Sequence, residues 1–178
     1  LTGRIFTALP DYMAENHGMV HPIYTWESLK FLGKLGVIYG ISGDQLPPHA
    51  LFNRQKIYDQ LKAATDIAGF VHPVQGMDWP YHFTDPGSPG LGAVACFLRD
   101  PDGARFERRL LQNLESRQDS NDGRLYDRKI SETVSGIQDP LVFRETFIRY
   151  TAYSYLLHRL YGDGVKPTPD RVLDKKLR

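Results

Sequence analysis

The chain of 178 residues is long enough to bury one hydrophobic core, and its 41% hydrophobic and 24% charged residues are typical of a globular domain. Its formal net charge is +1, from 22 Lys and Arg against 21 Asp and Glu, so the basic stripe that nucleic-acid binding requires is absent. No run of about 18 apolar residues occurs, and we expect no membrane-spanning helix.

Helical periodicity dominates the first third of the chain. From Pro22 to Tyr39 apolar residues recur every three or four positions, which predicts a helix over residues 23–41 with Pro22 in its first turn. A second apolar stripe of the same spacing predicts a helix over residues 48–68, and Gly69 supplies a stop signal.

The rest of the chain is also predicted to be helical. The run "AVACFLRD" reads as a short buried helix that ends before Pro101, and it contains the single cysteine, Cys96, which we expect to be a buried thiol. Further helices are predicted over residues 104–118 and 139–161, whereas "GFVHPV" is a weak strand signal at best. The sequence therefore predicts an all-α protein.

Two irregular segments, residues 70–90 and 119–138, separate these helices. A compact domain seldom keeps a structureless loop of about 20 residues unless the loop binds something or is disordered. His72, Trp79 and Tyr81 argue against disorder in the first segment, because disordered segments are poor in aromatic residues.

A polar cluster stands in "MAENHGMVHPIYTW", residues 13–26, with Glu15, Asn16, His17 and His21. The i, i+4 spacing of the two histidines resembles a zinc pair, but Pro22 disfavours helical backbone at His21, so we expect no metal site here. Turn and cap roles are one interpretation of the cluster. The other is chemical, since the positive end of the following helix favours anions.

A second cluster stands in "HPVQGMDWPYHF", residues 72–83. Trp79 suits the wall of a sugar site, although buried tryptophans in the core are more common. Tyr81 lies between Pro80 and His82 in the sequence, and a phenol acts as an acid or base once nearby cations lower its pKa from about 10.

Together, "ENHG" and "WPYH" resemble the heparinase II/III-like and alginate-lyase polysaccharide lyases over about residues 10–100. This resemblance implies an incomplete (α/α) toroid of antiparallel helical hairpins. Residues 1–167 would form the toroid domain, and residues 168–178 a charged linker toward a missing C-terminal β-sandwich domain. It also implies a secreted or periplasmic protein that acts on an acidic polysaccharide.

The resemblance assigns the chemistry as well. Asn16 and His17 would neutralise the carboxylate of a uronic acid, and Tyr81 would move protons during β-elimination. Substrate-binding roles would fall to a set of neighbouring polar and aromatic side chains: Glu15, His21, Trp79 and His82. This scheme requires neither a metal nor a cofactor.

Two alternatives remain open at this stage. The first is a toroidal glycoside hydrolase acting on uronyl sugars, for which Glu15, Asp78 and Asp85 would supply carboxylates. The second is a helical carbohydrate-binding domain without turnover, which would depend on the aromatic wall and not on the hydroxyl of Tyr81.

Overall fold

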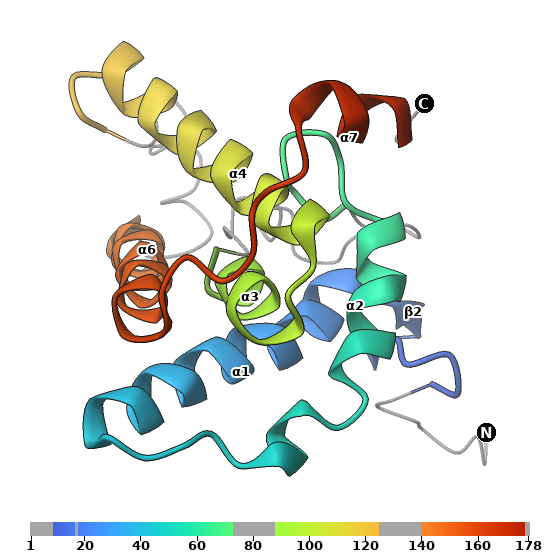
Figure 1. Cartoon of the computed structure of the whole chain (residues 1–178). Helices are drawn as coiled ribbons and strands as arrows, with labels where there is room; N and C mark the ends of the chain where they lie inside the picture. The colour runs from blue at the N-terminus through green and yellow to red at the C-terminus, as the bar shows by residue number, and fades with distance from the viewer. Residues whose placement is uncertain (1–8, 17, 73–87, 125–139, 177–178) are drawn as a thin grey trace.

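A computed structural model describes residues 9–16, 18–72, 88–124 and 140–176 of the chain (Figure 1). In this part of the chain the longest helices are α1 (Pro22–Ser42), α4 (Pro101–Ser120) and α6 (Pro140–Tyr161). The shorter ones are η1 (Pro48–Leu51), α2 (Arg54–Ala63), α3 (Ser88–Ala93), the π-helix η3 (Val94–Leu98) and α7 (Asp170–Lys176). The only sheet among these residues is a hairpin of β1 (Glu15–Asn16) and β2 (Met19–Val20), so the predicted all-α class is confirmed.

Helix α1 packs against α2, α3 and α6, and its bounds agree with the predicted span 23–41. Pro22 occupies its first turn, and Gly43 ends it in the left-handed conformation with φ of 77°. Trp26, Leu29 and Leu32 are each at most 2% exposed, because this face packs under α3. In Figure 1, α1 runs along the lower part of the molecule, with α2 near its start and α6 near its end.

The prediction of one continuous helix over residues 48–68 is wrong, because this segment forms two shorter helices. Asn53 adopts φ of 57°, which breaks the segment into the 3-10 helix η1 and the shorter helix α2. Helix α2 then ends at Ala63, because the Asp66 carboxylate accepts hydrogen bonds from the amides of Ala68 and Phe70 and folds those residues into a loop. Apolar spacing alone did not reveal either interruption.

The next segment agrees better with the sequence. Helix α3 continues directly into η3, and Asp100 then begins α4 by accepting a hydrogen bond from the Gly103 amide at 2.7 Å. Arg99 lies between them in the left-handed conformation, with φ of 56°. The helix end predicted before Pro101 is therefore confirmed, and a tight turn at Arg99 and Asp100 connects η3 to α4.

Helix α7 was not predicted, because the sequence analysis interpreted residues 168–178 as a charged linker. Leu173 is 1% exposed and belongs to the same core cluster as Trp26 and Phe106. Figure 1 shows the chain returning from α6 across α4 before it forms α7. A single buried leucine within a run of charges gives little periodic signal, so only the contact with α4 reveals this helix.

Candidate functional site

The hairpin that carries the first polar cluster lies directly before α1. Its two strands pair antiparallel, with Glu15 opposite Val20 and Asn16 opposite Met19. Gly18 provides the turn with φ of 78°, and its amide donates a 2.6 Å hydrogen bond to Oε1 of Glu15. The backbone at Asn16 is thus held in a short, closed hairpin beside a helix N-terminus.

The hairpin is fixed to α1 by hydrogen bonds to Ala14, the residue that precedes β1. The Ala14 amide donates to Oγ1 of Thr25 at 2.7 Å, and the Ala14 carbonyl accepts from the His21 amide at 2.8 Å. Thr25 is 4% exposed and His21 is 1% exposed. Both anchoring side chains are therefore buried, whereas Glu15, Met19 and Val20 of the hairpin are half-buried.

His21 has a structural role that agrees with the cap interpretation. Its Nδ1 accepts a hydrogen bond from the Tyr24 amide at 3.4 Å, which makes it the N-cap of α1, and the two rings are 4.1 Å apart. The buried His21 thus caps α1 through its side chain and joins the hairpin through its backbone amide.

The remaining residues of the predicted site fall outside the part of the chain that the structure describes. These residues are His17, Trp79, Tyr81 and His82, together with Asp78 and Asp85 of the hydrolase alternative. The shared catalytic role that the resemblance implies for His17 and Tyr81 therefore stays a prediction. Of the predicted set, the structure describes Glu15, the backbone of Asn16, and His21, which lie in the hairpin and at the start of α1.

The two ends that flank residues 73–87 are placed, and both lie near the start of α1. Val71, on one side, belongs to the core cluster of Trp26 and Leu29. On the other side, a Cβ added to Gly90 would lie 3.1 Å from Cε2 of Trp26. Trp26 follows the N-cap His21 by five residues, so these two flanking residues lie near the start of the helix that follows the hairpin.

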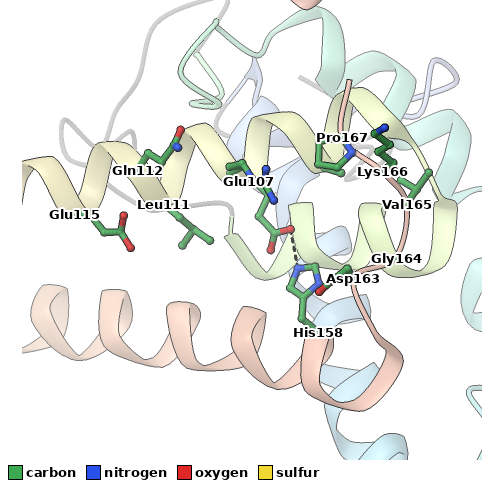
Figure 2. A pocket seen from close by; sticks show the side chains of 12 residues that line it. Glu107, Leu111, Gln112, Glu115, His158, Asp163, Gly164, Val165, Lys166 and Pro167 are labelled. Carbon is green, nitrogen blue, oxygen red and sulfur yellow. Dashed lines mark hydrogen bonds and ion pairs between the residues drawn. The ribbon is translucent and has the colours of Figure 1, made fainter. Parts of the chain in front are cut away.

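A second polar site lies between α4 and α6, and the sequence analysis did not find it. It borders a cavity of about 750 Å³ (Figure 2). Nε2 of His158 lies 2.9 Å from Oε2 of Glu107, and the hydroxyl of Ser154 donates to the other carboxylate oxygen. On its other side His158 approaches Cys96, with Nδ1 3.9 Å from the sulfur. Cys96 is half-buried, which corrects the expectation of a buried thiol.

The electrostatics of this second site are those of an ion pair. Contacts with Cys96 and with Glu107 raise the pKa of His158 to about 11, so its ring is protonated at neutral pH. Glu107 is 4% exposed, and Ser154 is 1% exposed. A signal did exist in the sequence: Glu107 occupies the buried stripe of α4 that also holds Phe106, Leu110 and Leu114. We interpret the pair as a clamp that joins α4 to α6.

No family model, no curated protein and no solved structure matches this chain. Across residues 9–16, 18–72, 88–124 and 140–176, no group of three or more His, Cys, Asp or Glu side chains is arranged to hold a metal ion. None of the helices in the same ranges has both the length and the apolar character needed to cross a membrane.

Proposed function

We propose that this chain is part of an (α/α) toroid and that it cleaves a uronic-acid-containing polysaccharide by β-elimination. The observation that supports this proposal is that the described residues next to both polar clusters meet near the start of α1. The Asn16 hairpin is hydrogen-bonded to the first turn of α1, Val71 belongs to the core cluster that contains Trp26 of the same helix, and Gly90 lies against the Trp26 ring. The all-α fold is consistent with the proposal.

The chemistry explains why these residue types are needed. A base removes the proton from C5 of the uronate, the C4–O4 bond breaks, and O4 leaves with a proton, so that a C4–C5 double bond remains. The intermediate carries additional negative charge next to a carboxylate, and donors at that position lower its energy. We assign Asn16 and His17 to the carboxylate and Tyr81 to the proton transfers.

Binding of the polymer draws on the same two segments. Glu15 on the hairpin side, with Trp79 and His82 on the other, would orient the sugar for elimination. His21, predicted as a substrate-binding residue, is 1% exposed and instead caps α1 beneath the hairpin. The proposed substrate class is an acidic polysaccharide, and the resemblance to secreted or periplasmic lyases supports a location in the same compartments. No metal and no cofactor enter this scheme.

Substitution of Tyr81 and Asn16 in the natural full-length protein tests the proposal on uronate polymers, with ultraviolet absorbance of the unsaturated product as the readout. Tyr81→Phe keeps the ring and removes the hydroxyl, and we expect turnover to fall by about 10²–10⁴-fold. Asn16→Ala removes a donor, with an expected loss of about 10²–10³-fold. His49→Ala is the control, since His49 is exposed on η1.

The products separate the proposal from its alternatives. Release of saturated sugars would show hydrolysis, and binding of the polymer without any product would show a carbohydrate-binding domain. A Tyr81→Phe protein with the wild-type rate would remove Tyr81 from the mechanism.

A further inference from the structure

Thr25 makes a pair of contacts that its position in a helix does not require. Its hydroxyl donates to the His21 carbonyl at 3.1 Å, one turn earlier in α1, as many helical threonines do. The same oxygen accepts the Ala14 amide at 2.7 Å, and this second bond reaches 11 residues back along the chain. One buried side chain therefore connects α1 to the strand that leads to Asn16.

The hairpin depends on such an anchor, because it is very small. Its ladder joins only two residue pairs, Glu15 with Val20 and Asn16 with Met19. A two-stranded hairpin is marginal in water even when it is longer. Its first strand enters at Ala14 and its second leaves at His21, and these two residues are joined by a 2.8 Å backbone hydrogen bond. Thr25 fixes this base of the hairpin to the helix.

We infer that Thr25 is a positioning residue, which acts through the Ala14 backbone to hold Asn16 in place at the N-terminus of α1. The use of this position in catalysis rests on the proposed function. Asn16 follows Ala14 by two residues, so loss of the anchor moves the backbone that carries Asn16, the residue assigned to the uronate carboxylate. A displacement of about 1 Å at a reacting group can reduce turnover by about 10²-fold.

Thr65 offers a matched control. It is also buried, with 7% exposure, and its hydroxyl donates to the Leu61 carbonyl one turn earlier at 2.8 Å. Among the contacts of the described residues, its hydroxyl accepts no hydrogen bond that corresponds to the Ala14 contact. Thr65 lies just beyond the end of α2, and Thr65→Val removes the same kind of side-chain hydrogen bond to a carbonyl four residues earlier as Thr25→Val does, while it leaves the hairpin anchor intact.

The experiment compares Thr25→Val, Thr25→Ser and Thr65→Val by amide hydrogen exchange and by steady-state kinetics. In Thr25→Val we expect exchange at Ala14 to rise about fivefold or more, since one hydrogen bond is lost. We also expect kcat to fall by about 10- to 100-fold with KM changed by less than about threefold. Thr25→Ser retains the hydroxyl and should restore both values to within about threefold, and Thr65→Val should leave both near wild type.

The two readouts keep this inference separate from the proposed function. If the wild-type protein forms no unsaturated product, the lyase proposal fails, and hydrogen exchange at Ala14 alone decides whether Thr25 anchors the hairpin. Unchanged exchange at Ala14 in Thr25→Val would overturn the anchor. Faster exchange together with an unchanged kcat in an active enzyme would overturn the positioning role.

Discussion

Two regions of this protein hold chain segments together by different means. At the start of α1, neutral hydrogen bonds among Ala14, His21 and Thr25 fix a hairpin to the helix that follows it. Around α4, ion pairs join residues far apart in sequence: Glu107 with His158 over 51 positions, and Asp102 with Lys176 over 74.

The difference has physical consequences. Neutral hydrogen bonds respond weakly to pH and salt, whereas ion pairs depend on protonation state and, where exposed, on ionic strength. The hairpin should therefore keep its geometry under conditions that loosen the contacts of α4 with α6 and α7.

Removal of the Glu107 carboxylate should have the largest effect on stability. Glu107→Ala removes the carboxylate that His158 and Ser154 contact. Removing one partner of a buried ion pair costs about 3–5 kcal/mol. This cost is reduced here because the His158 side chain is 26% exposed to solvent. We expect a loss of about 2–3 kcal/mol in the free energy of unfolding, measured by urea denaturation. Glu115→Ala, at an exposed position of the same helix, should change it by less than about 0.5 kcal/mol.

Asp102→Asn should have the second largest effect on stability. The buried Asp102 carboxylate forms ion pairs with Lys62 and Lys176 and accepts a hydrogen bond from the hydroxyl of Thr168. Although burial opposes ionisation, the hydrogen bonds from Lys62, Thr168 and Lys176 lower the pKa of Asp102 to about 2. Its contribution is thus present above the ordinary value of 3.8 and is lost as pH falls through about 2.

We expect Asp102→Asn to cost about 2 kcal/mol at pH 7 and to free α7 for tryptic cleavage at Lys175. The difference from wild type should shrink below pH 3. Equal resistance of the two proteins to trypsin would show that α7 is held by other contacts. Asp119→Asn, at an exposed position near the end of α4, is the control.

The His158 pair predicts a loss of stability in alkaline solution. Since the pKa of His158 is raised from 6.5 to about 11, its stabilising contribution is complete below pH 6.5 and declines as pH rises toward 11. Allowing for solvent screening, we expect this change to be on the order of 1–2 kcal/mol. His158→Gln lacks the titration, so the stability difference between wild type and variant should narrow between pH 7 and pH 10. A constant difference would contradict the assigned ion pair.

The smallest effect is expected for the exposed charges that hold α7. Arg109 contacts Asp170 at 2.7 Å and Asp174 at 2.8 Å, but the Asp170 side chain is 59% exposed. Arg109→Gln should therefore cost less than about 1 kcal/mol, and 1 M NaCl should remove most of the difference. The faster amide exchange at Ala14 that is expected in Thr25→Val should persist in the same salt, because the Thr25 hydrogen bonds are neutral.

Local signals in the sequence were sufficient to predict a helix where the helix has its own N-terminal cap, a periodic apolar face and a C-terminal stop residue. Pro22 and Gly43 bound α1, and Asp100 caps α4, so these elements follow from capping and periodicity. The helix predicted over residues 48–68 failed because two local polar preferences, the left-handed Asn53 and the loop formed around Asp66, interrupt a continuous apolar stripe.

By itself, the sequence determined the helical class, the spans of α1, α4 and α6, and the two polar clusters on which the proposed function rests. Only the tertiary structure decided that His21 is buried as a cap, that Thr25 anchors the hairpin, and that Glu107 meets His158. The physical reason is that periodicity and capping act within about one helical turn, whereas a buried hydrogen bond or ion pair between distant residues depends on how whole helices pack.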